Sequence, residues 1–180
     1  YDMVRVGIGM YGLSPDPSVK SARELGIEAA MTLSAPLTSV KVIEEGTPAS
    51  YGGTWQAPTR RWIGLVPLGY GDGILRASSN GAPVVVETER GLFPTQIVGR
   101  VCMDQFMIDL GPAEGEAGTP TSASGRPPAH VGDRAFLFGD PEKGCPSADK
   151  WALHAGTINY EIVTRLGERI PRNYQYEEEQ

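Results

Sequence analysis

Short apolar runs separated by turn-forming residues make up most of this chain. The strongest run, residues 62–68, is almost continuously apolar and predicts a buried strand. Residues 105–110 alternate between apolar and polar positions, which is typical of a strand with one buried face. Further strands are predicted at residues 4–10, 31–44, 83–87, 95–98 and 134–139, with a last extended segment at residues 169–172.

Few helices are expected, and they are short. Residues 18–30 contain helix-forming residues with weak periodicity. Ser147 is a suitable N-cap for a helix that begins after it. A second helix is expected over residues 157–166, with Gly167 as its C′ glycine.

This order of elements predicts a mainly β fold. About eight short strands at turn-punctuated spacing favour an antiparallel β-barrel-like domain, or a sandwich, with a few short helices. Residues 111–130 contain no large apolar side chain, so they are expected to form a flexible surface loop. The acidic residues 177–180 are expected to be a disordered tail.

Composition narrows the class of protein. The 180 residues can bury one sizeable core, and the net charge of −6 argues against a nucleic-acid partner. No apolar run is long enough for a membrane helix, and no signal peptide opens the chain, although its first residue is not Met. Two cysteines, Cys102 and Cys145, form neither a disulfide framework nor a zinc motif, so a cytoplasmic location is expected.

The candidate with the clearest chemical context is Tyr70, in Leu68-Gly69-Tyr70-Gly71-Asp72-Gly73. Three glycines around it predict a tight turn that presents one phenol at the end of a strand. The alternative is a turn tyrosine that is half-packed on the surface. A phenol has an ordinary pKa of about 10, so a base role near neutral pH would need an activating neighbour from elsewhere in the fold or from another chain.

Other candidates are weaker when each is taken alone. Arg5 precedes a glycine pair and could donate to a planar acceptor or form a surface ion pair. Asp104 could be a catalytic carboxylate or accept backbone N–H bonds in a turn. Tyr160, at a helix start, could simply pack against the sheet. The sequence shows no Ser/His/Asp order, no paired-carboxylate spacing and no metal-binding motif.

Taken together and in this order, five segments resemble the alanine racemase family, over almost the whole chain. The motifs that contain Tyr70 and Met103 are highly specific to it. The five segments are Arg5-Val6-Gly7-Ile8-Gly9-Met10-Tyr11-Gly12-Leu13, Ser50-Tyr51-Gly52-Gly53-Thr54-Trp55, Leu68-Gly69-Tyr70-Gly71-Asp72-Gly73, Gly99-Arg100-Val101-Cys102-Met103-Asp104-Gln105 and Thr157-Ile158-Asn159-Tyr160-Glu161.

The resemblance implies a division of the chain and a way of assembling. The family has an N-terminal (β/α)₈ barrel and a mainly β C-terminal domain. Residues 1–17 would then be the end of the barrel and a linker, and residues 18–176 the C-terminal domain. The family works as a homodimer in which one subunit's barrel meets the other's C-terminal domain. In the family, the lysine that binds pyridoxal 5′-phosphate lies in the part of the N-terminal barrel that this sequence does not include.

The resemblance also implies roles for single residues. Tyr70 would be the base that exchanges the α-proton on the L-alanine face, with the missing lysine serving the D-alanine face. Met103, with Asp104 beside it, would contact the substrate carboxylate through its backbone. For the cofactor, Arg5 would face the pyridine nitrogen, and the phosphate contacts would be Gly7, Ile8 and Tyr160.

Two positions depart from the family pattern, and three functions remain open. Gly71 and Ile74 stand where the family usually has alanine and tyrosine; Gly71 could loosen the turn, and Ile74 removes a hydroxyl.

The first function is that of part of an alanine racemase, which interconverts L-alanine and D-alanine and supplies D-alanine for peptidoglycan. This part would be inactive without the lysine that binds the cofactor. The alternatives are a noncatalytic dimerisation domain and a pyridoxal-phosphate racemase of broader amino-acid range.

Overall fold

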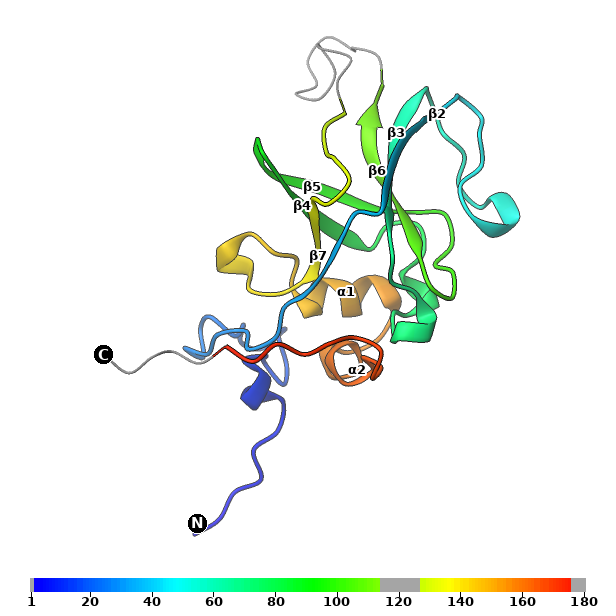
Figure 1. Cartoon of the computed structure of the whole chain (residues 1–180). Helices are drawn as coiled ribbons and strands as arrows, with labels where there is room; N and C mark the ends of the chain where they lie inside the picture. Colours follow the sequence, from blue (N-terminus) through cyan, green and yellow to red (C-terminus); the bar gives the residue numbers. More distant parts are fainter. Residues whose placement is uncertain (1, 114–126, 176–180) are drawn as a thin grey trace.

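One curled antiparallel sheet forms the body of the protein. The computed structural model describes residues 2–113 and 127–175, and within them seven strands form a single sheet in the order β1-β7-β4-β5-β6-β3-β2 (Figure 1). Every neighbouring pair is antiparallel. The strands are β1 Leu33–Pro36, β2 Ser39–Ile43, β3 Arg61–Val66, β4 Pro83–Thr88, β5 Gly91–Val98, β6 Phe106–Pro112 and β7 Arg134–Phe138.

The two edges of the sheet belong to neighbouring pieces of chain. Only Leu37 and Thr38 separate β1 from β2, although these strands lie at opposite ends of the strand order. The Leu37 N–H donates to the Asp133 carbonyl at 2.8 Å, and the Thr38 N–H donates to the Leu65 carbonyl at 3.0 Å. Two extended residues span roughly 10 Å at most between their flanking neighbours, so the sheet has to curl until its edges approach. The prediction of a mainly β, barrel-like domain is therefore confirmed, as a half-barrel.

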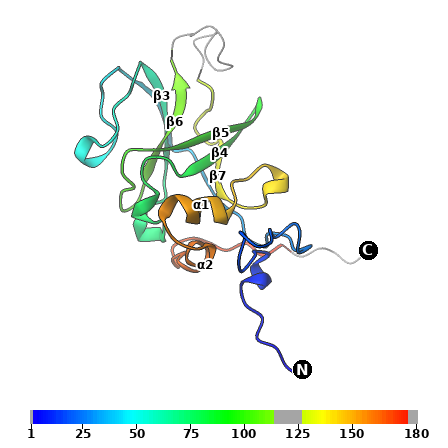
Figure 2. The same cartoon turned by 180° about the vertical axis from the view of Figure 1, so that it is seen from behind.

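Two short helices cover one end of this sheet. Helix α1 (Ala148–Ala155) lies against the sheet, and α2 (Asn159–Thr164) lies on the far side of α1 (Figures 1 and 2). Trp151 of α1 is almost fully buried, and its indole N–H donates to the Pro83 carbonyl at 2.9 Å. The main core therefore forms between the inner face of the sheet and these helices.

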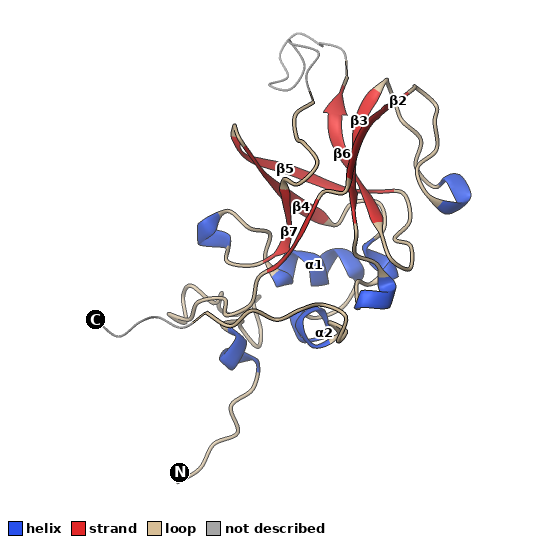
Figure 3. Ribbon diagram, in the orientation of Figure 1, coloured by secondary structure: helices blue, strands red, loops and turns tan. Residues whose placement is uncertain are grey.

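The described ranges also contain five short 3₁₀ helices, which Figure 3 draws in blue with the two α-helices. They are η1 Ile8–Tyr11, η2 Tyr51–Gly53, η3 Tyr70–Asp72, η4 Arg76–Ser78 and η5 Pro141–Lys143.

The predicted strand at residues 4–10 is wrong. Residues 2–7 form no strand, and η1 begins at Ile8. Val4 and Val6 are mostly exposed, and only Ile8 of this segment is buried. An apolar run forms a strand only when a neighbouring strand pairs with it, and no described residue pairs with this one.

Three other expectations need correction. Residues 18–30 form turns rather than a helix, with Gly26 at a left-handed φ of 68°. Helix α2 ends at Thr164, with right-handed geometry at Arg165, so Gly167 is not its C′ residue. Instead, the Gly167 N–H donates to the Asp72 carbonyl at 2.8 Å. Residues 168–170 form a turn, so the extended segment expected from residue 169 is also wrong.

The helix start at Ser147 is as predicted. The Ser147 hydroxyl accepts the Lys150 N–H at 3.1 Å and caps α1. The expected loop at 111–130 is shortened, because Gly111 and Pro112 belong to β6. Its residues 114–126 and the expected tail at 177–180 lie outside the described residues. No helix in the described ranges is both long and apolar enough to cross a membrane.

Candidate active site

Tyr70 lies in a closed turn directly after β3. The Gly69 N–H donates to the Asp72 carboxylate at 2.8 Å, and the Asp72 N–H donates back to the Gly69 carbonyl at 2.9 Å. Because these two bonds satisfy both ends of η3, the turn is locally rigid. Tyr70 is 48% exposed. Its hydroxyl has no hydrogen-bond partner in the described part of the chain. The turn therefore presents the phenol outward, as its flanking glycines predict.

The loop that contains Met103 lies directly beside this turn. The Tyr70 N–H donates to the Cys102 carbonyl at 2.9 Å, and the Gly71 N–H donates to the Met103 carbonyl at 2.8 Å. A Cβ at Gly69 would lie 2.3 Å from both of those carbonyl oxygens, so only glycine allows this approach. Met103 is half-exposed on the same surface. The fold thus joins Tyr70 and Met103, which lie more than thirty positions apart in the sequence.

Arg169 connects these two segments through their carboxylates. Its Nη2 lies 3.0 Å from Asp72 Oδ1 and 2.9 Å from Asp104 Oδ1. The hydrogen bond to Asp104 and the negative charge of Asp72 raise the pKa of the Arg169 guanidinium. Asp104 follows Met103, and Asp72 lies two residues after Tyr70. One cation therefore holds the acidic residues next to both candidate site residues.

The C-terminal side of α2 supports the Tyr70 turn from behind. Gly73 has a left-handed φ of 102°, and a Cβ there would lie 2.1 Å from the Arg165 carbonyl oxygen. Together with the bond from Gly167 to Asp72, this places the end of α2 against η3. The helix that carries Tyr160 and the turn that carries Tyr70 are therefore packed together.

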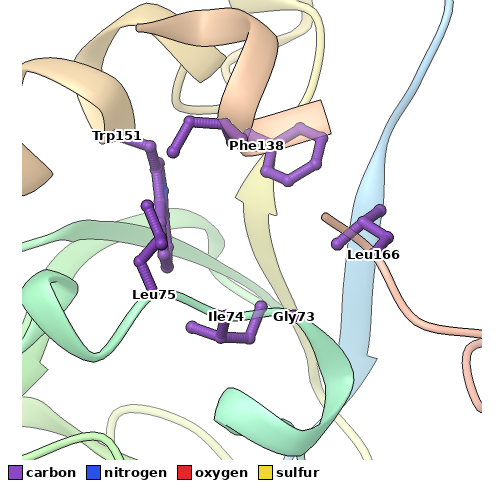
Figure 4. A pocket seen from close by; sticks show the side chains of 7 residues that line it. Gly73, Ile74, Leu75, Phe138, Trp151 and Leu166 are labelled. Carbon is purple, nitrogen blue, oxygen red and sulfur yellow. The ribbon is translucent and has the colours of Figure 1, made fainter. Parts of the chain in front are cut away.

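Ile74 is buried in the core, unlike the exposed Tyr70. Figure 4 shows it among apolar side chains around a cavity of about 10 Å³, at most the space of one water molecule. Ile74 is 4% exposed. Ile74, where the resemblance implies a tyrosine, is thus a packing residue in this structure. The cavity is lined by Gly73, Ile74, Leu75, Phe138, Trp151, Ile162 and Leu166.

Tyr160 is partly buried against the main core, near the start of α2. The neighbouring Asn159 is buried, and its side-chain amide donates to the Ser14 carbonyl at 2.9 Å. The Thr157 hydroxyl donates to the Glu161 carboxylate, which lowers the pKa of Glu161. The start of α2 is thus fixed both internally and to the N-terminal segment.

The remaining candidates, Arg5, Gly7 and Ile8, lie in that N-terminal segment. Ile8 packs into the same main core against which Tyr160 rests. Arg5 and Gly7 are exposed, and the segment before η1 runs away from the body of the molecule (Figure 1). The structure therefore joins Tyr70, Met103 and Asp104, whereas it does not bring Arg5 to them.

Sequence reasoning missed Asp72 and Arg169. Asp72 lies three positions after Gly69, which is the spacing of a capping box. This spacing could have indicated that the Asp72 carboxylate accepts the Gly69 N–H. No local signal could have indicated Arg169, because it lies 65 residues from Asp104 along the chain. Among the described residues, no group of three or more His, Cys, Asp or Glu side chains could hold a metal ion.

The fold and the site together define a class of protein. Within the described residues, the half-barrel presents a phenol, a backbone loop and a carboxylate–arginine network on its surface. Chemically active side chains on loops that a rigid sheet positions are typical of an enzyme domain.

Comparisons with known proteins give the family. The family described as "Alanine racemase, C-terminal domain" matches residues 30–174. A curated alanine racemase from Streptomyces coelicolor is 44% identical over 174 residues. These residues are 97% of this chain and 40% of that protein. The chain belongs to the alanine racemase family.

Solved structures give the same result. The alanine racemase from Streptomyces coelicolor A3(2) matches with a TM-score of 0.81 and 43% identity, over 95% of this chain and 40% of that one. The alanine racemase from D-cycloserine-producing Streptomyces lavendulae matches with a TM-score of 0.82 and 40% identity, over 98% of this chain and 41% of that one. The chain thus spans about two fifths of the length of these relatives.

Proposed function

We propose that this chain is the C-terminal portion of an alanine racemase that interconverts L-alanine and D-alanine by two-base proton exchange and supplies D-alanine for peptidoglycan. Residues 1–17 would be the end of the barrel and its linker, and residues 18–176 the C-terminal domain. Family membership supports the reaction. The observation that carries the proposal is the rigid turn that holds an exposed Tyr70 against the Met103 loop.

Tyr70 would exchange the α-proton on the L-alanine face. A general base needs a fixed position within hydrogen-bond reach of the proton that it removes. The backbone bonds of Tyr70 and Gly71 to the Met103 loop supply that fixed position. Met103 and Asp104, on the same surface, would meet the substrate carboxylate. The phenol and the carboxylate contact would then approach the substrate from one domain.

The candidates in the N-terminal segment, Arg5, Gly7 and Ile8, offer hydrogen-bond donors that a phosphorylated cofactor could accept from. The first turn of a helix has N–H groups without intrahelical acceptors, and phosphate binds such groups well. A Cβ at Gly7 would meet nothing within 4 Å, so the backbone beside Ile8 is open to a ligand. Tyr160 would add a hydroxyl, and Arg5 a guanidinium that cannot readily accept a proton. When bound, pyridoxal 5′-phosphate supplies the electron sink that makes the α-proton removable.

The segment that carries Arg5 runs away from the body of the molecule in this chain, which supports an active site assembled from two subunits. In a homodimer, Tyr70 of one subunit would approach the cofactor held by the other. We propose that the reaction takes place in the cytoplasm, and that the chain by itself is inactive because it lacks the lysine that holds the cofactor.

The test is Tyr70→Phe in the full-length enzyme. Removing one hydroxyl from a half-exposed ring should leave folding intact and lower the rate of L-to-D conversion about 10²- to 10⁴-fold. Tyr174→Phe is the matched control, because Tyr174 is 75% exposed and belongs to no site segment. A Tyr70→Phe enzyme that racemises L-alanine at the normal rate would show that the proposed role of Tyr70 is wrong.

A further inference from the structure

Two carboxylates in the site differ sharply in their freedom to move. Asp72 is 7% exposed, and its Oδ2 already accepts the Gly69 N–H, so it is fixed in the Tyr70 turn. The Asp104 side chain is 54% exposed. Its one hydrogen bond within the described residues comes from Arg169. Arg169 thus anchors to a fixed group on one side and restrains a free one on the other.

The turn leaves room for this arginine at Gly71. A Cβ at that position would lie 2.4 Å from Arg169 Nη2 and 3.0 Å from the Met103 carbonyl oxygen. Gly71 does not have a left-handed φ. An L-residue could therefore adopt its backbone conformation, and the space for the guanidinium is what the glycine provides. The absence of a side chain at position 71 and the reach of Arg169 belong to one arrangement.

The bridge from Arg169 to Asp72 and Asp104 is expected to affect the positions of the site residues more than the stability of the fold. The Arg169 side chain is 55% exposed, and exposed ion pairs contribute little to stability. Catalysis is far more sensitive, because a displacement of about 1 Å at a reacting group can cost on the order of 10²-fold in rate. Arg169 is well placed for such an effect, since it joins the turn of the base to the loop of the carboxylate contact.

We propose that Arg169 is a positioning residue for proton exchange, which sets the Tyr70 phenol relative to the Met103–Asp104 loop. It touches neither substrate nor cofactor in this role and acts through Asp72 and Asp104. The inference rests on the proposed function, because it needs Tyr70 to be the base on the L-alanine face.

The kinetic test compares Arg169→Met and Arg169→Lys in the full-length enzyme. Loss of the bridge should lower kcat about 10- to 100-fold, and lysine should recover part of the loss because one Nζ can still lie between two carboxylates. With α-deuterated L-alanine, the primary isotope effect should rise in Arg169→Met. Tyr70 removes that proton, and a displaced Tyr70 would make its removal more rate-limiting. The isotope effect should not rise with α-deuterated D-alanine, whose proton the lysine removes.

Amide hydrogen exchange in the same full-length variants gives a readout that is independent of turnover. The Tyr70 and Gly71 amides, which bond to Cys102 and Met103, should exchange faster in Arg169→Met. Arg23→Ala is the matched control, since it removes another exposed ion pair, with Glu142 at 3.4 Å. That control should change neither kcat nor exchange at residues 70–71.

Two results would overturn the inference. One is an Arg169→Met enzyme with unchanged isotope effects and unchanged amide exchange at residues 70–71. The other is a loss of rate that is accompanied by a lower melting temperature, with equal isotope effects from both enantiomers. That result would show that Arg169 has a merely structural role. Failure of the proposed function would look different, because Tyr70→Phe would then keep its activity while the amide exchange still reported on the bridge.

Discussion

Gly69, Gly71 and Gly73, the three glycines around Tyr70, each leave space that a neighbouring segment occupies. Gly69 lets the carbonyls of the Met103 loop approach, Gly71 makes room for the Arg169 guanidinium, and Gly73 lies against the Arg165 carbonyl with a left-handed φ. The sequence pattern indicates a tight turn, which the structure confirms. The structure adds that two of the three glycines are needed for space rather than for backbone conformation, so their substitution would act on neighbouring segments.

Gly71→Ala in the full-length enzyme should therefore slow the proposed racemisation by disturbing its neighbours. The added methyl must displace Arg169 Nη2, which is the flexible end of a side chain, and it would lie 3.0 Å from the Met103 carbonyl oxygen, so the melting temperature should fall only modestly. We expect kcat to fall roughly fivefold, or about 1 kcal/mol, which is within the range of couplings between contacting residues. The effect should shrink in an Arg169→Met background, and the double-mutant cycle on kcat measures this. Additive effects of the two changes would show that Gly71 does not act through Arg169.

Helix α1 illustrates what local sequence determines about an element. Ser147 caps its start, and Gly156 ends it with a left-handed φ of 69°, as capping rules would have it. Gly167 looks equally suitable as a terminator, yet α2 stops three residues earlier and Gly167 bonds to Asp72. Short-range rules hold where the helix end faces solvent, and they fail where another segment competes for the same backbone groups.

Ser147→Ala tests the importance of the α1 cap. Loss of the hydroxyl leaves the Lys150 N–H without its acceptor, which should lower the free energy of unfolding by about 1 kcal/mol. Urea denaturation measures this as a lower midpoint at unchanged slope. Ser147→Asp should restore most of the loss, because aspartate is also a good N-cap. An unchanged midpoint for the alanine variant would mean that the bond does not stabilise the fold.

Closure of the sheet is a property of the whole molecule. The sequence predicts one strand-like stretch at residues 31–44, and the structure divides it into β1 and β2, which pair with opposite edges of the sheet. No pattern within that stretch specifies its change of partner between Leu37 and Thr38. The change depends on β7 and β3, which come later in the chain.

The exposed N-terminal segment leads to a prediction about the complete protein. Met3, Val4, Val6 and Met10 are all mostly exposed in this chain. If the segment is the end of a barrel, proteases should cut it readily in this chain alone and slowly in a protein that also contains the barrel. Limited proteolysis with mass spectrometry, comparing cleavage within residues 3–10, measures the difference. Equal cleavage in both proteins would contradict the proposed division of the chain.

The sequence by itself determined most of the strands, the turn at Tyr70 and the family, since alternation, apolar runs and glycine spacing are properties of neighbouring residues. The predicted strand at residues 4–10 failed because its apolar residues have no partner strand in the described residues. Only the tertiary structure decided that the Tyr70 turn lies on the Met103 loop, and that Arg169 bridges the two carboxylates. These contacts join segments more than thirty positions apart, and they depend on how the sheet curls and where α2 packs, which no local pattern contains.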